Sequence, residues 1–512
     1  MSIKSIFREV RKDRETGWRF TIILCLVYAA YLVWMHVHHE MWRDEVHPWT
    51  LARLAHGFWD LVTGDRAYEG HPPMWFWYLR VWTWFIDPAW GIQVATATAA
   101  TAAAVLFVRF GPFPRYLKVV ALFSFYFAFE YTVMSRNYIL GWLCLCIFCT
   151  LYHPLRIRHV GIALALAALS LTSFYGLTLS IFLLGFLVLD QVGVSLTRTD
   201  VAPPARINLA ASPWFLAAVA FVSAAILFCV AYLEPPEPNP FYPHFNWGGL
   251  TLSAIPDMLY RLTAAFLPWR KYSMTDFWAL HTAWEARSFW ADALGITVLV
   301  LALASLWPSW RLMLIYLCAV TFMNIFSAVR FEGVSRHWGH YLLLFIAGSW
   351  VLRTTYPRRR HWLSTAFLFA VFAFQMEASL VAMALETQEV FSGGRETAAF
   401  IVSHGLQDLP IVAGPDYHAV TVAGYLRRPF IAHETDEINQ TVVFHSRRRP
   451  FSTVALVNRA VEVARERQSP VLLVCNQGLP DPPPGTTRTH LFTSKPGTVG
   501  DEIFSVYRVE AH

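Results

Sequence analysis

The sequence predicts an α-helical polytopic membrane protein with about eleven transmembrane helices, followed by a small α/β domain outside the membrane. Three observations predict this fold class. Of the 512 residues, 56% are hydrophobic and 15% are charged, whereas soluble proteins usually carry about 25% charged residues. Long apolar runs recur up to about residue 385. Beyond that point, shorter strand-like and helix-like patterns take their place.

Each predicted transmembrane helix is an apolar run of about 20 residues, the length that crosses the hydrocarbon core. The first run lacks the small-residue cleavage site of a signal peptide, so we expect it to be retained as a membrane helix. Together the runs predict a membrane module over residues 18–385. They begin near Trp18, Gly91, Tyr116, Asn137, Val160, Leu177, Pro213, Phe289, Arg311, Trp338 and Trp362.

Basic residues predict the orientation of this module, because Lys and Arg favour short cytoplasmic loops. The N-terminal segment, residues 1–17, is basic, and with it in the cytoplasm every second loop is basic as well. The alternation predicts a periplasmic first loop over residues 38–90. The basic residues of the N-terminus and of these loops are Lys4, Arg8, Arg11, Lys12, Arg14, Arg19, Arg109, Arg115, Lys118, Arg156, Arg158, Arg198, Arg206, Arg311, Arg358, Arg359 and Arg360.

One apolar stretch, residues 73–90, must stay on one side for this alternation to hold. It contains Arg80, is bounded by prolines and is rich in aromatic residues. These features are typical of a helix that lies in the membrane interface. We therefore predict that this stretch does not cross the membrane.

The last segment, residues 386–512, is predicted to be a periplasmic α/β domain. A strand-like run from Asp408 to Ala413 precedes a helical pattern that ends near Leu426. A second helical pattern over residues 454–468 precedes a buried-strand pattern over residues 470–475. Alternation of this kind is typical of a small α/β fold. The segment contains no GxGxxG, Walker A or HExxH motif, which argues against nucleotide or protease chemistry.

Composition excludes several other classes of protein. The net charge of +6 is small and is not gathered into one basic face, so no nucleic-acid partner is expected. Six of the seven cysteines lie in apolar segments, which leaves neither a disulfide framework nor a paired-cysteine zinc site. Lysine supplies only 5 of the 41 basic residues. This bias suggests a GC-rich bacterial genome and hence the bacterial inner membrane as the location.

The chemistry-bearing residues gather in the first predicted external loop. Asp44 and Glu45 follow the first span directly, beside Arg43. Acidic groups at a membrane interface are costly unless they are paired or used. One alternative is purely structural, with Asp44 capping the next helix and pairing with Arg43. A second motif, Glu-Gly-His-Pro-Pro-Met at residues 69–74, favours a functional role.

The two motifs together resemble the glycosyltransferase-C (GT-C) superfold of polyprenyl-phosphate-sugar-dependent membrane transferases. In the protein O-mannosyltransferase and lipid A aminoarabinose transferase branches, an acidic residue, often Asp-Glu, follows the first helix. A Glu-x-Pro-Pro or His-Pro-Pro-Leu stretch then closes the first external loop. Residues 44–45 and 69–74 match this pattern in order and at a similar separation. The usual basic residue beside the second motif is replaced here by Gly70-His71.

This resemblance implies an inverting transfer of a sugar from a polyprenyl-phosphate donor to an acceptor hydroxyl on the periplasmic face. The acceptor would be a glycan, a lipid or a protein. By analogy Asp44, with Glu45 beside it, is the candidate catalytic carboxylate, which acts as a base. Glu69 matches the second acidic position, which binds a divalent metal in the aminoarabinose branch, and His71 or His47 could join it. The alternative for Glu69 and His71 is hydrogen bonding within the loop.

Candidate ligands for the donor phosphate are basic and polar residues at outer helix ends. Arg136 lies in the next predicted external loop, and Arg336, His340 and Tyr341 lie in a later one. Guanidinium groups bind phosphate oxygens in pairs. The alternative is that these arginines only reach from helix ends to the interface, as many do in membrane proteins.

Two other functions compete with the transferase. A transporter or flippase of lipid-linked sugars is expected to show internal repeats and charges near the bilayer midplane. An O-antigen-ligase-type enzyme would place its main chemistry in a large late loop. The first loop is the one rich in carboxylates and histidines here, which favours the polyprenyl-phosphate transferase.

Overall fold

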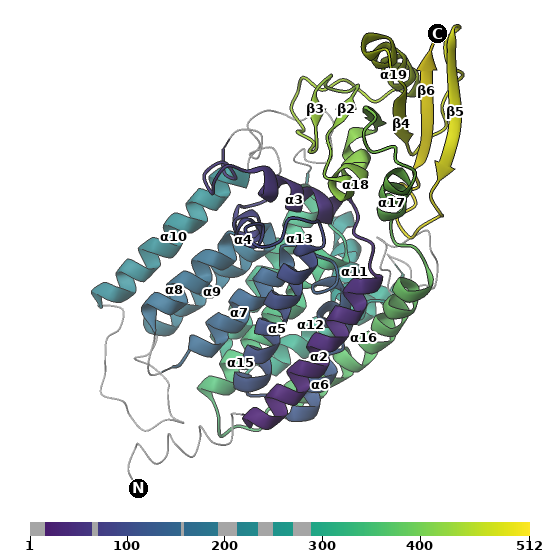
Figure 1. Cartoon of the computed structure of the whole chain (residues 1–512). Coiled ribbons are helices and arrows are strands. Elements are labelled where there is room, and N and C mark those ends of the chain that lie inside the picture. The colour runs from purple at the N-terminus through teal and green to yellow at the C-terminus, as the bar shows by residue number, and fades with distance from the viewer. Residues whose placement is uncertain (1–15, 64–69, 155–157, 193–211, 234–248, 270–287) are drawn as a thin grey trace.

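A computed structural model describes residues 16–63, 70–154, 158–192, 212–233, 249–269 and 288–512. It contains a helical bundle with a small α/β domain at one end (Figure 1). Glu69 and most of the predicted cytoplasmic N-terminus lie outside the described residues, as do Arg156, Arg198 and Arg206. The first bundle helix begins at the end opposite the α/β domain (Figure 1).

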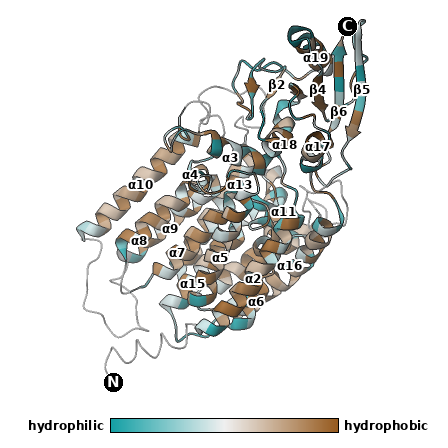
Figure 2. Ribbon diagram, in the orientation of Figure 1, coloured by the Kyte–Doolittle hydropathy of each residue, from teal (hydrophilic) through white to brown (hydrophobic). Residues whose placement is uncertain are grey.

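Each of the eleven predicted runs contains a helix. Among the described residues, six helices are long and apolar enough to cross a membrane by length and composition, which makes the chain a polytopic membrane protein. They are α2 (Trp18–His38), α5 (Gly91–Phe110), α10 (Pro213–Leu233), α12 (Phe289–Leu306), α13 (Trp310–Val329) and α16 (Trp362–Gln388). Hydrophobic residues predominate along the helices of the bundle (Figure 2), and α10 is exposed along most of its length.

The helices in the other five runs are too short, over their described residues, to count as candidate spans, so eleven complete spans stay a prediction. These helices are α6 (Arg115–Leu122), α7 (Tyr138–Leu151), α8 (His159–Ser170), α9 (Phe174–Val192) and α15 (His340–Thr355). The run near Tyr116 is interrupted, because α6 ends at Leu122 and a π-helical turn, Tyr126–Glu130, follows it. π-Helical turns often occur at functional sites. This turn leads into the loop that carries Arg136.

Short helices fill the end of the bundle that faces the α/β domain. They are α3 (Arg43–Leu54), α4 (Met74–Trp82), α11 (Ile255–Phe266) with the 3₁₀ turn Leu252–Ala254 before it, and α14 (Ser335–Trp338). Nine residues of α4 span roughly 14 Å, about half of the ~30 Å hydrocarbon core. This length supports the prediction that residues 73–90 do not cross the membrane.

Small residues allow close packing inside the bundle. Ala95, Ala99 and Ala103 of α5 are buried on one face of this helix, which packs against α2 and α7. Alanine at such positions lets membrane helices approach closely. Tyr28 of α2 is fully buried, and its hydroxyl donates to the carbonyl of Phe127. These contacts hold α2 in the bundle, and the candidate loop begins after this helix.

The α/β domain contains a six-stranded sheet with the order β3-β2-β1-β4-β6-β5. Strands β1, β2 and β4 are parallel to one another, whereas β3 and β6 pair antiparallel with β2 and β4, and β5 pairs antiparallel with β6. Its elements are α17 (Gly394–Ser403), β1 (Ile411–Gly414), α18 (Asp416–Leu426), β2 (Phe430–Ala432), β3 (Ile438–Asn439), α19 (Thr453–Arg467), β4 (Val471–Cys475), β5 (Thr486–Thr493) and β6 (Ser505–Ala511). The predicted strands and helices at 408–426 and 454–475 are confirmed.

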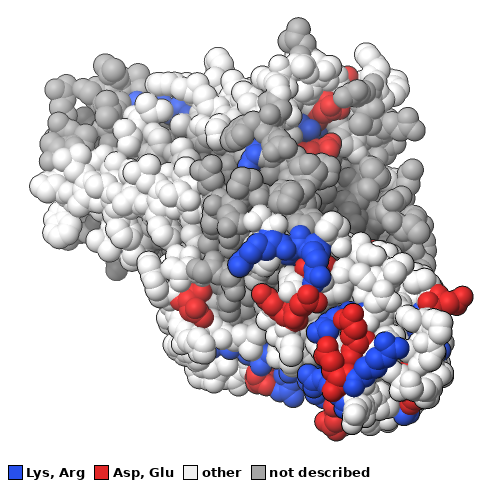
Figure 3. All heavy atoms as spheres, turned by 90° about the horizontal axis from the view of Figure 1, so that it is seen from above, with Lys and Arg blue, Asp and Glu red and all other residues white. Residues whose placement is uncertain are grey.

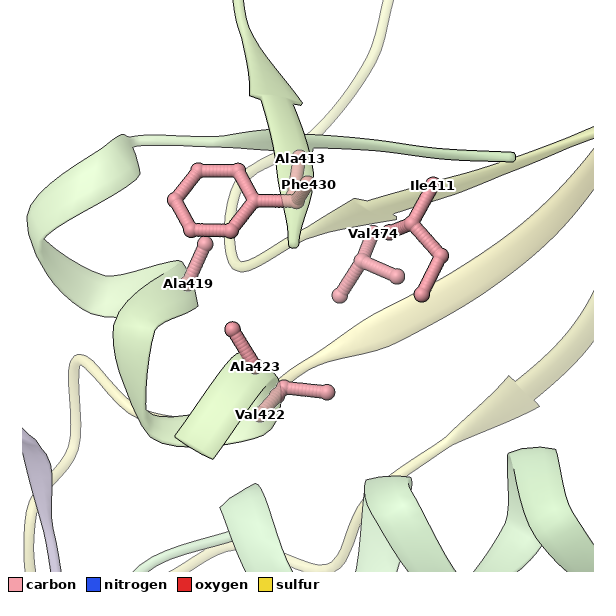
Figure 4. Close-up of a pocket in the computed structure, with 7 residues that line it drawn as sticks. All are labelled: Ile411, Ala413, Ala419, Val422, Ala423, Phe430 and Val474. Atoms are coloured by element: carbon pink, nitrogen blue, oxygen red, sulfur yellow. The ribbon is translucent and has the colours of Figure 1, made fainter. Parts of the chain in front are cut away.

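Apolar packing joins α18 to the sheet. Side chains of α18 and of β1, β2 and β4 surround a small apolar space (Figure 4). All of the lining residues are hydrophobic, so this space belongs to the core of the domain. They are Ile411, Ala413, Ala419, Val422, Ala423, Phe430 and Val474.

Charge is distributed unevenly over the end that carries the α/β domain. Figure 3 looks down on this end and shows charged side chains gathered in one part of the face, beside described residues that carry no charge. The α/β domain carries exposed ion pairs, such as Arg449 with Asp436 and Arg459 with Glu462 and Glu466. Exposed pairs of this kind add little to stability.

Candidate active site

Asp44 and Glu45 lie in the first turn of α3 and have different surroundings. The sequence left open whether Asp44 caps this helix and pairs with Arg43. Glu45 makes the capping bond instead, because its Oε2 accepts the backbone N–H of Trp42 at 3.3 Å. The Arg43 side chain forms its ion pairs with the C-terminal domain. The structure therefore does not show the purely structural role, in which Asp44 would cap α3 and pair with Arg43.

The Asp44 carboxylate forms an ion pair with Arg136. The Asp44 side chain is 31% exposed, whereas the Arg136 side chain is 10% exposed, so the carboxylate remains accessible beside an enclosed cation. Burial alone would raise the pKa of Asp44, but the guanidinium groups of Arg136, Arg43 and Arg336 lower this pKa below its usual value. Asp44 is therefore ionised at neutral pH.

Glu45 is completely buried and links three parts of the chain. Its Oε1 accepts the backbone N–H of Ser135 at 2.6 Å, and its Oε2 lies 2.8 Å from Nε2 of His39. Nδ1 of His39 lies 2.9 Å from Oε2 of Glu386, so the imidazole bridges two carboxylates. Burial alone would lower the pKa of His39, but Glu45 and Glu386 raise it well above its usual value. A charged His39 donates to both carboxylates. Both carboxylate oxygens of Glu45 are therefore engaged in hydrogen bonds.

His71 and Arg336 complete the cluster around Asp44. Burial and the charge of Arg136 lower the pKa of His71 to about 4, with Asp44 opposing and Arg336 adding to the shift. These charges therefore lie within electrostatic range of one another. The ion pair of Asp44 with Arg136 joins the start of α3 to the loop before α7. His71 is neutral near pH 7.

Two tyrosines position the segment that carries Arg336. The hydroxyl of Tyr131 donates to the carbonyl of Arg336 at 2.8 Å, and the hydroxyl of Tyr126 donates to the carbonyl of Ser335 at 3.2 Å. Both tyrosines belong to the π-helical region before Arg136. The same turn of chain therefore places both candidate phosphate-binding arginines.

His337 and His340 follow Arg336 in the chain and are buried. Nδ1 of His337 accepts the backbone N–H of Val334 at 2.9 Å, so its Nε2 carries the proton and donates to the Tyr138 hydroxyl at 2.9 Å. Burial and the charge of Arg336 lower the pKa of His337 well below its usual value. Nδ1 of His340 donates to the carbonyl of His337 at 2.9 Å, and the His340 ring lies against aromatic neighbours. Both histidines are neutral partners of the surrounding rings and backbone.

Tyr341 faces a different part of the bundle. It is fully buried in α15, and its hydroxyl donates to Oδ1 of Asn324 on α13 at 3.1 Å. This bond joins two bundle helices. The structure therefore groups Arg136, Arg336 and His340 but gives Tyr341 a packing role.

The residues that the structure describes do not provide a ready ligand set for a divalent metal. Within those residues, no group of three or more His, Cys, Asp or Glu side chains could hold a metal ion. His71 lies near two guanidinium groups, which repel a cation. His47 is buried on α3. Glu69 lies outside the described residues, so its metal-binding role stays a prediction and no chemical step is derived through a metal.

Comparison with known proteins identifies the fold. No protein-family model matches the sequence, and no curated protein matches it. The crystal structure of ArnT from Cupriavidus metallidurans bound to undecaprenyl phosphate matches with a TM-score of 0.54 and 14% sequence identity, covering 95% of this chain and 97% of that one. The apo crystal structure of the same protein matches over the same shares, with a TM-score of 0.51 and 12% identity. The chain has the ArnT fold.

ArnT is a lipid A aminoarabinose transferase of the GT-C fold, so the predicted resemblance is confirmed for the fold. Identity this low shows architecture alone, and chemistry must be argued from the site.

Within the ArnT fold, sequence reasoning missed several residues that hold the site together. His39 lies in a histidine-rich stretch at the end of α2, which gives a weak signal. Glu386 and Ser135 gave none, because Glu386 lies 347 positions from its partner His39 and Ser135 lies 90 positions from its partner Glu45. Tyr131 and Tyr138 resembled ordinary interfacial aromatics. Only tertiary structure brings these residues to the loop of Asp44.

Proposed function

We propose that the chain is an inverting membrane glycosyltransferase, which moves a sugar from a polyprenyl-phosphate donor to an acceptor hydroxyl. One observation carries this proposal: the accessible carboxylate of Asp44 pairs with Arg136, with Arg336 and His71 within electrostatic reach. A base beside cations is what such a transfer requires. The neighbour ArnT, which was crystallised bound to undecaprenyl phosphate, supports the donor class.

In the proposed reaction, the acceptor oxygen attacks the anomeric carbon as Asp44 takes the hydroxyl proton. The bond from the anomeric carbon to the phosphate oxygen breaks on the opposite face, and polyprenyl phosphate leaves with the electron pair. The donor is a phosphodiester with one negative charge, and the released monoester carries up to two. Arg136 and Arg336 stabilise the added charge as it develops.

The ion pair of Asp44 with Arg136 suggests how donor binding prepares the base. A carboxylate whose pKa is lowered by a guanidinium is a weak base, and a general base works best with a pKa near the operating pH. When the donor phosphate competes for Arg136, the carboxylate loses its main cationic partner. Its pKa then rises toward the working range. Donor binding would thus activate Asp44 before the acceptor reacts.

The orientation of the chain is part of the proposal. Lys118 donates to the carbonyl of Val108 at 2.7 Å, and the guanidinium of Arg109 lies 4.8 Å from the ring centroid of Trp18. These basic residues gather where α2 begins, at the end opposite the α/β domain. By the positive-inside rule this end faces the cytoplasm. The Asp44 site and the α/β domain then face the periplasm of a bacterial inner membrane.

The test is transfer from a panel of radiolabelled polyprenyl-phosphate sugars in membranes that carry the wild type or Asp44→Asn. This substitution keeps the size of the side chain and removes its basicity. We expect the wild type to consume one donor and Asp44→Asn to lose at least a hundredfold in rate, since general bases contribute about 10²–10⁴-fold. Asp87→Asn is the matched control, because the Asp87 side chain is exposed and pairs with Arg53 and Arg427 at the loop surface.

Equal rates for Asp44→Asn and the wild type would refute the catalytic assignment. Turnover of no donor in the panel would refute the transferase. Transport of the lipid-linked sugars across proteoliposomes would then be measured, since a flippase moves the donor without consuming it.

A further inference from the structure

Arg43, the residue directly before Asp44, is held by two acidic residues of the C-terminal domain. Its guanidinium donates to both oxygens of Asp501, at 2.9 and 3.0 Å, and to Oε1 of Glu502 at 3.2 Å. Its backbone N–H also donates to Oε1 of Glu502, at 3.0 Å. Arg43, Asp501 and Glu502 are called the Arg43 junction below. The junction fixes the side chain and the backbone at the start of α3.

Glu502 is itself fixed within its own domain. The hydroxyl of Thr421 on α18 donates to its Oε1 at 3.1 Å, and the hydroxyl of Ser392 donates to its Oε2 at 2.6 Å. The backbone N–H of Gly393 donates to the Glu502 carbonyl at 3.0 Å. The Glu502 side chain is fully buried. A buried carboxylate with this many donors has one position, so it is a rigid support for Arg43.

Helix α3 also packs closely on α18 of the C-terminal domain. A Cβ atom placed on Gly424 would lie 2.0 Å from Cγ1 of Val46 and 3.1 Å from the Thr50 hydroxyl. The absence of a side chain at this position therefore permits the contact. Helix α3 is thus held by the C-terminal domain through Arg43 and Val46, and by the bundle through Glu45.

We propose that Asp501 and Glu502 are positioning residues for the transfer, which hold Arg43 and so fix the turn that carries Asp44. The inference rests on the proposed function, because it takes Asp44 as the base. A reacting group misplaced by about 1 Å can lose 10²-fold in rate. The C-terminal domain is then a working part of the active site.

Protonation of Glu502 should make kcat depend on pH, which a purely structural role of this residue would not. Burial raises the pKa of Glu502 to about 7, against the charge of Arg43 and the hydrogen bond from Ser392, with Asp501 adding to the rise. These residues and Thr421 are the charged and hydrogen-bonding groups facing it. A protonated Glu502 no longer carries the negative charge that attracts the Arg43 guanidinium. The junction therefore weakens as pH falls through about 7.

Asp501 stays charged over the same range. Burial would raise its pKa, but hydrogen bonds from His418 and Arg43 hold this pKa well below its usual value. The Asp501–Arg43 bond therefore persists when Glu502 is protonated. Any change of rate near pH 7 that depends on the junction belongs to Glu502.

The experiment measures kcat and donor KM from pH 5.5 to 8.5 for the full-length wild type, Glu502→Gln and Asp501→Asn in lipid nanodiscs. We expect both variants to lose about 10- to 100-fold in kcat at pH 8 with donor KM unchanged. The wild-type kcat should fall toward that of Glu502→Gln as pH drops through about 7. Glu502→Gln should show no transition there, because its side chain does not titrate.

Hydrogen exchange of the peptide 41–54 gives a readout that does not need substrate. Glu502→Gln should exchange faster at the start of α3, since the Arg43 N–H has lost its charged acceptor. Arg43→Lys provides a second test, because it keeps the charge but loses the paired bonds to Asp501. We expect an intermediate kcat from it. All rates are taken per mole of monodisperse protein, which removes the contribution of misfolded material.

Asp87→Asn is the matched control, since it breaks another ion pair between the two domains, with Arg427, and should keep the wild-type kcat and pH profile. Wild-type kcat in both Glu502→Gln and Asp501→Asn, while Asp44→Asn is inactive, would overturn the junction alone. Activity in Asp44→Asn would overturn the proposed function instead. An equal loss in Asp87→Asn would also overturn the inference, because general docking of the domain would then explain the effect.

Discussion

The carboxylate of Glu45 accepts the backbone N–H of Ser135 at 2.6 Å. Each of these residues has a neighbour in the candidate site, because Asp44 precedes Glu45 and Arg136 follows Ser135. The buried bond therefore helps to set the distance between the accessible Asp44 carboxylate and the enclosed Arg136 guanidinium, which form their own ion pair. Of the two adjacent acidic residues, Glu45 supports the structure, whereas the carboxylate of Asp44 is accessible for chemistry.

Glu45→Ala should destabilise the protein by about 3–5 kcal/mol, the usual cost of removing one partner from a buried ionic network. The loss leaves the N–H of Ser135 without its acceptor and a charged His39 with one carboxylate, that of Glu386. Thermal unfolding in detergent measures the change. The control is Glu462→Ala on an exposed face of α19, which should stay within about 0.5 kcal/mol of wild type. Wild-type stability of Glu45→Ala would contradict the network.

The fold and part of the site could be predicted from the sequence, because both depend on local patterns. Apolar runs mark the helices, and Asp44 and Arg136 lie at the ends of two such runs. The broken run near Tyr116 was not predicted, since hydropathy does not distinguish a π-helical turn from a continuous helix. The partners of Arg43 were not predictable either, because Asp501 and Glu502 lie more than 450 positions away. Such contacts depend on how the two domains dock.

Arg136→Gln should move the acid limb of the pH dependence of kcat/KM to higher pH. The reaction needs ionised Asp44, so the rate is lost as pH falls through the pKa of this carboxyl. The guanidinium of Arg136 lowers that pKa, and without it burial raises the pKa. The profile of kcat/KM reports the free enzyme. Arg428→Gln, which removes an exposed ion pair with Asp408, should leave the limb unchanged. An unmoved limb in Arg136→Gln would show that another group titrates.

Arg336→Gln should raise donor KM by about 10- to 100-fold. A hydrogen bond to a charged group contributes about 1.5–3 kcal/mol, and 1.4 kcal/mol corresponds to a factor of ten. Donor titration at saturating acceptor measures the change. Arg358→Gln, at the exposed loop before α16 on the opposite end of the bundle, should leave donor KM as in wild type. An unchanged KM for Arg336→Gln would remove this arginine from the donor site.

Gly424→Ala should weaken the docking of the C-terminal domain, because the added methyl group would lie 2.0 Å from Cγ1 of Val46. Overpacking of this kind costs about 1–3 kcal/mol. Val46→Ala removes the opposing methyl groups, so the double variant should recover most of the stability lost. Coupling between contacting residues reaches about 0.5–3 kcal/mol, which unfolding of the four proteins of the cycle can resolve.

The same cycle separates docking from an effect inside α18. Gly478→Ala is the control, since a Cβ at Gly478 meets no atom within 4 Å and should change neither stability nor rate. If Gly424→Ala acts through α3, its kcat falls as well and recovers with Val46→Ala, because both residues set where α3 lies. Strictly additive losses in the double variant would mean that the two residues do not meet. Helix α3 would then be placed by Arg43 and Glu45 alone.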